Sequence, residues 1–461
     1  MSVSRRFFAF FLSVTLAGGV FAAEGAAAPT AEPNAAPTAA EIEARRRDTI
    51  RYGTDAEILK LVIDLEAEKT DYLDDELLRV LEATKNGKIA SSVFGFFARK
   101  KNATAESRAL RILRERDQEA NEAVDAAIGY LGDIASREAP APLREILDAE
   151  ETRFQDGAVR ALGKTGGDDA DGNAAFLLSY FEDREIGEGV KQSIIGALGA
   201  LGSKKATPFL SDLARNGDEK AVRRMAALES IGKIGDPEAL EAVLEALGTG
   251  DPNVRAVAVA TLGPFTGEKV DSAILEAFRD SFYKTRSAAA KAAGERKLEA
   301  AVSYLRYRAE RDEVAAVRDD AIRALGKIGS APALQNVREV FDEKKNPDRA
   351  RVVAAETLLA SGSGESALAV VAALEEAKSQ KRTALANGLL KALAAAKSPD
   401  LEDFARRLLG SADLTDKLYA LDLVRGNKFR ALSDDVAKLT EDKNAAVSRR
   451  ARDVLASFEA P

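Results

Sequence analysis

The sequence contains no cysteine, no histidine and no tryptophan among its 461 residues. The missing cysteine excludes disulfide bonds, thiol nucleophiles and a lipid anchor on an N-terminal cysteine. The missing histidine excludes imidazole acid–base catalysis, and the two absences together exclude every zinc site built on Cys or His. No pair of carboxylates stands out from the many solvated acidic residues. We therefore expect a non-enzymatic protein with no cofactor and no metal.

Aromatic residues are also scarce, and acidic residues outnumber basic ones, 75 to 67. Aromatic residues make up 6% of the chain, which also has 13 prolines, and the formal net charge is −8. With alanine and leucine abundant, this composition suits a stack of small-residue helices better than a large globular core. The negative charge disfavours binding to nucleic acid phosphates. We expect a protein partner and no nucleic acid.

What the sequence does contain is one stretch that recurs. Residues 317–329 read VRDDAIRALGKIG, residues 154–166 read FQDGAVRALGKTG, and residues 190–202 read VKQSIIGALGALG. The same glycine marks seven copies, with steps of 31, 36, 33, 31, 31 and 32 residues: Gly132, Gly163, Gly199, Gly232, Gly263, Gly294 and Gly326. A fixed period in this range is typical of a repeat array.

Each copy has the apolar spacing of a helix. Val317 is followed by apolar residues four, five and eight positions later, which places all four on one helix face. The residue at the fifth position is small in nearly every copy, with Ile194 the exception, so a neighbouring helix can approach closely. The copies close on glycines that tolerate the left-handed conformation of a helix end: Gly166, Gly202, Gly235 and Gly329.

A second helix follows each copy. Asp236-Pro237 opens one, with the aspartate as N-cap and the proline at the first helical position, and Asp251-Pro252 opens the next copy. Each unit is therefore two antiparallel helices in about 32 residues. One pair cannot bury its own apolar face, so pairs must stack on their neighbours. We predict an all-α protein, an alpha-solenoid of about twelve antiparallel helix pairs.

The pattern VRxxAxxALGxIG followed by PxAL resembles the short HEAT-like repeat, the variety also found in phycobilisome lyases. The resemblance covers roughly Ile89 to Phe458, with the best copies between Ala123 and Gly329. The resemblance implies a stack of HEAT-like repeats and says almost nothing about function. The tetratricopeptide motif needs a tryptophan and the ankyrin motif a histidine, so the absence of both residues excludes these repeats.

The first 22 residues have the organisation of a signal peptide that exports a bacterial protein. Arg5-Arg6 precedes an apolar run over residues 7–17, and residues 20–22 put small side chains before a cleavage site. Residues 4–8 read SRRFF and also resemble the twin-arginine motif, so both export routes stay open. The run is shorter than the ~20 residues of a membrane span. We expect export to the periplasm or cell envelope, with no membrane insertion after the signal is removed.

The remainder divides by composition into four parts. Residues 23–40 are rich in Ala, Pro and Thr and predict a disordered linker. Residues 123–362 predict the core repeats, between degenerate repeats over residues 41–122 and over residues 363–461 with a terminal cap. Residues 91–101 (SSVFGFFARKK) are unusually aromatic, and we favour core packing of an N-terminal cap over an apolar docking surface.

Residues 166–173 (GGDDADGN) account for the longest step between copies and predict an inserted polar loop. Asp169, Asp171 and Gly172 match positions three, five and six of an EF-hand calcium loop. Positions one and twelve would be Gly167 and Leu178, so two ligands are missing. We favour a flexible polar loop, and calcium binding stays open as the alternative.

A basic residue follows the first position of six successive copies: Lys191, Arg224, Arg255, Arg286, Arg318 and Arg351. One hypothesis is a track for an acidic partner. The other is a structural ladder, in which each pairs with an acidic residue just before a helix: Asp218, Asp251, Asp312 or Asp348. Such ladders are common in HEAT-like arrays, so the resemblance favours the ladder. Exposed ion pairs are worth only ~0–1 kcal/mol each and serve mainly to set geometry.

Five aromatic residues gather in two consecutive predicted helices: Phe278, Phe282, Tyr283, Tyr304 and Tyr307. We place Phe282 one turn after Phe278 on the same helix, with Tyr283 at the rim of its apolar face, and we expect one or both of the other tyrosines to be partly exposed. Tyrosine and arginine are enriched in binding hot spots. The candidate partner-binding residues are Tyr283, Tyr304, Tyr307, Arg279 and Arg306. A repeat junction filled by aromatic side chains is the alternative.

Together these features predict an exported, non-enzymatic HEAT-repeat scaffold that mediates protein–protein interaction in the periplasm or cell envelope. The alternative function is a lyase-like or chaperone-like factor, which the resemblance to phycobilisome-lyase HEAT-like proteins implies. That alternative depends on an analogy of fold and on no catalytic motif of this chain.

We predict that the mature protein begins near Ala23 and lies outside the cytoplasm, because a basic n-region, a short apolar run and small residues precede that position. N-terminal sequencing of the native protein after cell fractionation checks this. A cytosolic chain that keeps Met1 would contradict it.

Overall fold

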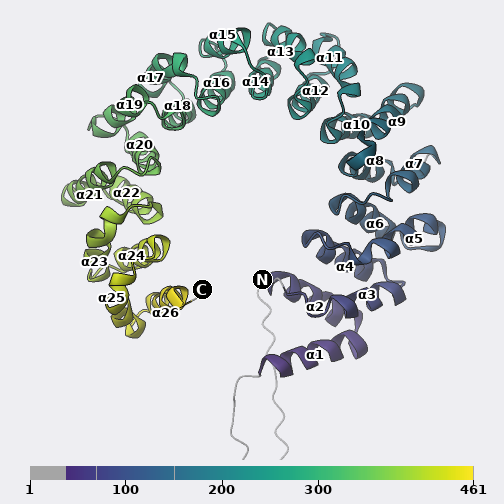
Figure 1. Ribbon diagram of the computed structural model, residues 1–461, viewed down its shortest axis with the longest axis horizontal. Helices are drawn as coiled ribbons and strands as arrows, with labels where there is room; N and C mark the ends of the chain where they lie inside the picture. The colour runs from purple at the N-terminus through teal and green to yellow at the C-terminus, as the bar shows by residue number, and fades with distance from the viewer. Residues whose placement is uncertain (1–37, 69, 150, 460–461) are drawn as a thin grey trace, which may run out of the picture. The chain divides into compact units, whose positions relative to one another are not determined.

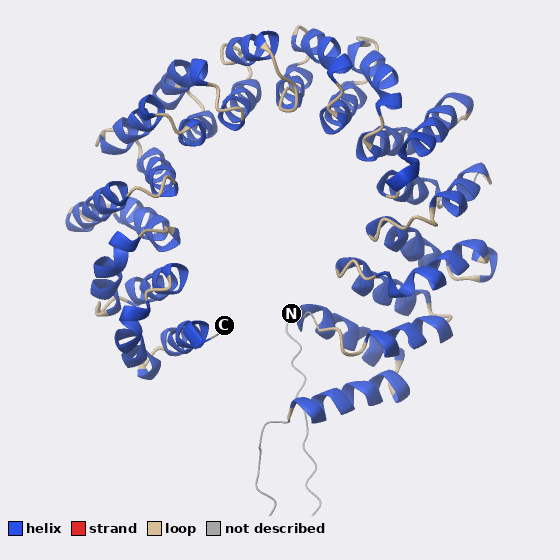
Figure 2. Cartoon of the chain, viewed as in Figure 1, coloured by secondary structure: helices blue, strands red, loops and turns tan. Residues whose placement is uncertain are grey.

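The computed structural model describes residues 38–68, 70–149 and 151–459. All regular structure in these residues is helical, with 26 α-helices, nine short 3-10 helices and no strand (Figure 2). The contacts divide the chain into two units, Met1–Leu61 and Val62–Pro461. The predicted signal peptide, and all of the predicted linker up to residue 37, lie outside the described residues.

Unit 1 contains α1 (Ala39–Tyr52) and the start of α2 (Asp55–Glu68). Thr38 caps α1: its hydroxyl accepts from the N–H of Glu41, whose carboxylate accepts from the N–H of Thr38. This capping box starts the helix at Ala39, within the residues predicted as linker, whose boundary at residue 40 was therefore slightly wrong.

Unit 2 arranges its helices in two rows (Figure 1). The first row consists of α3 (Asp74–Ala83), α5 (Glu106–Arg114), α7 (Pro140–Asp148), α9 (Ala170–Asp183), α11 (Thr207–Arg215), α13 (Leu240–Leu247), α15 (Glu268–Ala277), α17 (Val302–Arg311), α19 (Ala331–Asp342), α21 (Gly364–Ser379), α23 (Glu402–Leu409) and α25 (Ser433–Lys438). The second row consists of α4 (Gly87–Arg99), α6 (Asn121–Asp133), α8 (Gln155–Lys164), α10 (Glu188–Leu201), α12 (Ala221–Ile234), α14 (Pro252–Thr261), α16 (Tyr283–Glu295), α18 (Ala315–Ile328), α20 (Asp348–Ala360), α22 (Thr383–Ala395), α24 (Leu414–Asn427) and α26 (Ala445–Glu459).

The recurring sequence forms the second row. From α6 onward, each second-row helix packs against the first-row helix that precedes it in the chain and against its second-row neighbours. Helices α3 to α26 make twelve pairs, which confirms the predicted alpha-solenoid. Short 3-10 helices join many of the elements: η1 (Ala103–Ala105), η2 (Arg116–Gln118), η3 (Gly167–Asp169), η4 (Lys204–Ala206), η5 (Pro237–Ala239), η6 (Glu299–Ala301), η7 (Pro399–Leu401), η8 (Arg430–Leu432) and η9 (Leu439–Glu441).

The core lies between the two rows. The apolar residues that define the helix face of α18 are all fully buried: Val317, Ala321, Ile322 and Leu325. Three phenylalanines of the aromatic segment in α4 are buried as well, namely Phe94, Phe96 and Phe97. Core packing at the N-terminal end of unit 2, which we favoured over a docking surface for that segment, is confirmed.

At four of the seven recurring glycines, an added Cβ atom would lie within 3.0 Å of the backbone of the next second-row helix. A Cβ atom added to Gly163 would lie 2.8 Å from the Cα atom of Ala197, and one added to Gly294 would lie 2.8 Å from that of Ala324. In both cases the opposing residue stands two positions before the next recurring glycine. No side chain fits such a gap without moving a backbone, so the glycine recurs because the stacking requires it.

Gly263 departs from this rule. Helix α14 ends at Thr261, and the nearest atom to a Cβ on Gly263 is a backbone oxygen of its own segment at 3.8 Å. Pro264 follows at once, and proline cannot continue a helix. The connection to α15 then runs through Gly267 at a φ of +114°. The junction between α14 and α16 is therefore built differently from the junctions at Gly163 and Gly294.

The glycines that close the helices behave as predicted with one exception. Gly202, Gly235 and Gly329 have φ angles of +69°, +66° and +71°. Gly166 has a φ of −51°, because α8 already ends at Lys164, with Thr165 as its C-cap. Asp236 and Asp251 act as the predicted N-caps, the first for η5 and the second for α14.

The prediction of a polar loop over residues 166–173 is wrong. These residues form η3 and the first turn of α9, where Asn173 is fully buried. The extra length lies in α9, which has 14 residues where α7 and α11 have nine each. Asp169 pairs with Arg144 of the preceding repeat at 2.8 Å, and Asp171 accepts from Ser203 of the following repeat at 2.6 Å. Their carboxylates hold repeats together.

We predict opposite effects for two glycine substitutions within second-row helices. Gly294→Ala should lower the free energy of unfolding by about 1–3 kcal/mol, because the new methyl group collides with Ala324. Gly129→Ala should raise it by about 0.5–1 kcal/mol, because nothing lies within 4 Å of that position and alanine favours the helix. Urea denaturation followed by circular dichroism measures both. Equal effects would contradict the role of the recurring glycine.

Candidate functional site

The basic stripe predicted from the sequence is largely buried between repeats. Arg286 is 4% exposed, and its Nε and Nη2 atoms donate to Asp312 at 2.7 and 2.9 Å. Its Nη1 atom donates to the carbonyls of Asp280 and Ser281 at 3.0 and 2.9 Å. Four of the five N–H groups of this guanidinium donate within the protein, and Glu313 lies 3.6 Å from its Nη2 atom.

The preceding repeat has the same arrangement. Arg255 donates to the carboxylate of Asp280 at 2.7 and 3.1 Å and to the carbonyls of Thr249 and Gly250. Each aspartate also accepts from the backbone at the start of the following helix, Asp280 from Phe282 and Asp312 from Val314. Each carboxylate thus accepts from the N–H of the residue that precedes a second-row helix and holds the arginine of the second-row helix before it. This geometry supports the structural ladder over the track for an acidic partner.

The other members of the stripe use carbonyl groups. Arg224 donates to the carbonyl of Ala214, Arg318 to that of Asp312 and Arg351 to that of Phe341. Lys191 is different, since its ammonium lies 5.6 Å from the ring centre of Phe181.

Of the acidic partners predicted from the sequence, only Asp312 joins this ladder. Asp251 caps α14, Asp348 pairs with Arg382, and Asp218 is exposed. The sequence-based prediction missed Asp280, because it assumed that a single helix continued through that position.

Burial and ion pairing act in opposite directions on the ladder carboxylates. Burial alone raises the pKa of Asp312, but the hydrogen bonds from Arg286 and Val314 and the charges of Arg286 and Arg308 bring that pKa below its ordinary value. The pKa of Asp280 is lowered for the same reasons, with Arg255 as its main partner. The hydrogen bond to Asp312 raises the pKa of Arg286.

The candidate aromatic residues do not share the predicted helix. Helix α15 ends at Ala277, Phe278 is its C-cap, and Phe282 is the N-cap of α16, which begins at Tyr283. The placement of Phe282 one turn after Phe278 on a single helix is therefore wrong. The cause is Asp280, whose carboxylate accepts from the N–H of Phe282 at 2.7 Å and starts a new helix there.

Three of the five candidate residues come together at a hollow of about 300 Å³ between α15 and α17. The ring of Tyr304 stacks on buried Phe278 at 5.7 Å between centroids. Arg279 lies 5.6 Å from the centre of the Tyr304 ring, and Tyr307, which is 59% exposed, forms the outer edge. Arg308 lies 5.4 Å from the Tyr307 ring. We call the hollow formed by Phe278, Arg279, Tyr304, Tyr307 and Arg308 the tyrosine hollow.

The other two candidates lie outside the tyrosine hollow. Tyr283 packs edge-on against Phe282 at 5.4 Å and is 38% exposed. Arg306 points toward α19, with ion pairs to Glu310 at 3.0 Å and to Glu339 at 4.0 Å. Tyr283 and Arg306 lie near the hollow residues in the sequence. In the structure, the loop between α15 and α16 separates Tyr283 from the hollow.

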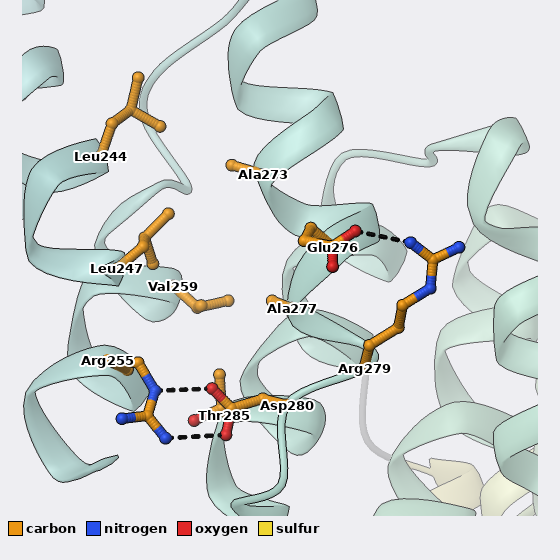
Figure 3. Close-up of a pocket in the computed structure, with 10 residues that line it drawn as sticks. All are labelled: Leu244, Leu247, Arg255, Val259, Ala273, Glu276, Ala277, Arg279, Asp280 and Thr285. Carbon is orange, nitrogen blue, oxygen red and sulfur yellow. Dashed lines mark hydrogen bonds and ion pairs between the residues drawn. The ribbon is translucent and has the colours of Figure 1, made fainter. Parts of the chain in front are cut away.

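A second cleft, of about 390 Å³, lies on the other side of α15 and was missed in the sequence (Figure 3). Leu244 and Leu247 of α13 face Ala273 and Ala277 of α15 across it, over a floor that includes Val259. The ion pair of Arg255 with Asp280 lies at one end of the cleft, and the pair of Arg279 with Glu276 lies beside α15. We call this the α13–α15 cleft. The only sequence feature that indicated it was the Gly263-Pro264 interruption of α14.

The described residues contain no group of three or more acidic side chains placed to hold a metal ion. None of the described helices combines the length and the apolar character needed to cross a membrane. The tyrosine hollow and the α13–α15 cleft both combine aromatic or aliphatic walls with arginines among the lining residues.

A family model described as spirochaete HEAT repeat protein matches residues 50–454. No curated protein matches the chain. Among solved structures, Kap95p in complex with RanGDP is 12% identical, and the match covers 90% of this chain and 72% of that one with a TM-score of 0.45. The CpcE–CpcF complex of phycocyanin lyase from Nostoc is 19% identical over 69% of this chain and 94% of that one, with a TM-score of 0.28. At such identities these likenesses concern the fold alone.

We predict that the ladder matters for stability and not for partner binding. Replacing Arg255, Arg286 and Arg318 with Gln should lower the melting temperature and leave partner capture nearly intact, because buried Asp312 and half-buried Asp280 lose their cations. Differential scanning calorimetry and a capture assay on the same variant check this. Lost capture at an unchanged melting temperature would show that the stripe is a binding track.

The ladder should also make the stability of the protein depend on pH in the acidic range. Because the folded pKa of Asp312 lies below the unfolded value of about 3.9, its contribution is complete above that value and is lost as the pH falls through the folded pKa. Asp312→Asn should lower the melting temperature at pH 7 and flatten its decline between about pH 5 and pH 3. Asp422→Asn, which removes the exposed pair with Arg450, is the control and should change neither.

Proposed function

Because the chain belongs to the family of spirochaete HEAT repeat proteins, we propose that it is an exported, non-enzymatic scaffold that binds a protein partner in the periplasm or cell envelope. The repeat array itself supports this proposal. Stacked helix pairs expose a long surface on which each repeat contributes one strip, and such surfaces suit extended protein partners.

The observation that carries the proposal is the tyrosine hollow. Tyr307 is the most exposed large apolar side chain of the described part of unit 2 apart from Ile63, and it stands beside Tyr304 and two arginines over a concave surface. Tyrosine and arginine contribute large contact areas and keep a polar group for hydrogen bonds, which makes them frequent binding hot spots. The basic stripe offers no comparable surface, because its arginines donate hydrogen bonds to carboxylates and carbonyls of the protein itself.

The non-enzymatic part of the proposal is supported by composition. A chain without histidine or cysteine has no imidazole base and no thiol nucleophile, and its tyrosines and arginines at the hollow are ion-paired or stacked. The net charge of −8 argues for a protein partner over a nucleic acid. Export is supported by the basic and apolar pattern of the first 22 residues.

The alternative of a lyase-like or chaperone-like factor gains nothing from the phycocyanin lyase complex. With 19% identity and a TM-score of 0.28, that likeness is too weak to transfer an activity.

We predict that the tyrosine hollow is required for partner binding. Tyr304→Ala combined with Tyr307→Ala should weaken capture of a stoichiometric partner from the envelope fraction by tenfold or more, or ~1.4 kcal/mol. The melt should stay cooperative and near that of the parent, because Tyr307 is exposed. Quantitative cross-linking and calorimetry measure the two effects.

Two variants serve as controls for this experiment. Tyr283→Ala removes an exposed tyrosine outside the hollow, and Leu368→Ala removes a side chain that is 55% exposed on α21. Both should capture the partner as the parent does. A large fall in stability of the double variant, or unchanged capture, would overturn the tyrosine hollow as the contact site.

A further inference from the structure

Helix α15 buries a smaller part of its length than α7 and α23 of the same row. Two of its ten residues are buried, Val270 and Ile274, and buried Phe278 follows as the C-cap. Four of nine residues are buried in α7 and four of eight in α23, all of them apolar. Because apolar burial is the main force that holds a helix in such an array, α15 detaches at a lower free-energy cost than α7 or α23.

Open space lies on both sides of α15. The α13–α15 cleft, of about 390 Å³, borders Ala273 and Ala277, and the tyrosine hollow, of about 300 Å³, borders Phe278 and Arg279 (Figure 3 shows the cleft). Protein interiors are close-packed and contain few voids larger than a water molecule. The two flanks of α15 therefore lack the dense side-chain packing that fixes a helix in place.

The connection that enters α15 is anchored by one side chain. From Gly263 to Lys269, Phe265 is the only buried residue. Gly267 has a φ of +114°, a conformation that glycine adopts readily and other residues adopt rarely. The residues on either side of Phe265 thus add no buried side chain that would oppose a movement of α15.

Arginines of the following helices hold the two ends of α15. At its start, Arg296, the C-cap of α16, donates to the carbonyl of Phe265 and to the carboxylate of Asp271 at 2.7 Å. At its end, Arg308 of α17 donates to the carbonyl of Phe278. Water replaces such hydrogen bonds when a helix detaches, so each contributes much less to stability than its strength in isolation.

Two ion pairs add to these contacts. Arg255 of α14 donates to Asp280, just beyond the end of α15, at 2.7 Å. Lys269 pairs with Glu241 of α13 at 2.6 Å, but both side chains are exposed, and exposed pairs contribute little. Polar contacts at the ends and few apolar side chains between them therefore hold α15 in the array.

We propose that α15 is a movable helix, which detaches from the array as one unit while α13, α14, α16 and α17 stay folded. Phe265 is the pivot, and Arg296 holds the helix in its attached position. Because Arg279 lines both openings, detachment joins the α13–α15 cleft and the tyrosine hollow into one groove. The inference goes beyond the proposed function, since it concerns a movement of this protein alone and requires no partner.

Hydrogen–deuterium exchange of the purified protein, measured by mass spectrometry, tests this movement. Under native conditions we expect the protection factors of the amides in α15 to lie about tenfold or more below those in α7 and α23. Protection of α15 equal to that of α7 and α23 would overturn the proposal. Exchange of α15 only together with the rest of unit 2 would overturn it as well.

Two substitutions should change the protection of α15 in opposite directions. Arg296→Met removes the donor to Phe265 and Asp271 and should lower the protection about tenfold. Ala277→Leu adds apolar contact with the leucines across the cleft and should raise it about threefold or more. Neither should change α7 or α23. Unchanged protection of α15 in Ala277→Leu, which keeps every ion pair, would overturn the proposal even where Arg296→Met does not fold.

Arg116→Met and Ala395→Leu are matched controls. Arg116 is a partly buried arginine of η2 that donates to a carboxylate and to a backbone carbonyl, as Arg296 does. Ala395 lines a hollow at the ends of α20 and α22. Both controls should leave the protection of α15 as it is in the parent. A change of α15 in either control would show that its exchange follows the stability of the whole array, and would overturn its independent movement.

Discussion

The close contact between consecutive second-row helices is the constraint on which the rest of the structure depends. At Gly163 and Gly294 the next helix lies so near that a single added carbon atom would collide with its backbone. The contact sets how each pair stacks on the last, and the stacking in turn buries the apolar face that one pair alone would leave in water. The sequence motif therefore recurs about every 32 residues because the packing contact recurs at that interval.

The buried ladder depends on this stacking and reinforces it. Arg255, Asp280, Arg286 and Asp312 form a continuous line in which each aspartate accepts from the backbone just before one second-row helix and neutralises the arginine of the helix before it. Removing one member leaves a buried charge unpaired, so the energetic cost of a broken pair exceeds the value of the intact one. A row of arginines that looks like a binding track in the sequence is for this reason part of the interior.

The candidate site lies beside an irregular junction. A Cβ atom added to Gly263 would meet no atom of the next helix, α14 ends before Pro264, and openings lie on both sides of α15. Aromatic and aliphatic side chains that a regular junction would bury are partly exposed here, with arginines at the rim. A repeat array gains specificity through such irregular repeats, because identical repeats present identical surfaces. Export, the absence of catalysis and the identity of the partner are proposals that this surface motivates.

The sequence by itself determined the all-helical repeat fold, the twelve helix pairs and the capping of helices by Asp236, Asp251 and Gly329, because apolar period, N-cap chemistry and left-handed glycine are local properties. It also placed tyrosines and arginines in one region of the chain. Only the tertiary structure decided which of them meet. Tyr304, Tyr307 and Arg279 converge because Phe278 stacks beneath one ring, whereas Asp280 starts a new helix and carries Tyr283 away. No sequence motif predicts the α13–α15 cleft, because it is a gap between side chains from four helices. Its existence depends on how closely those helices pack.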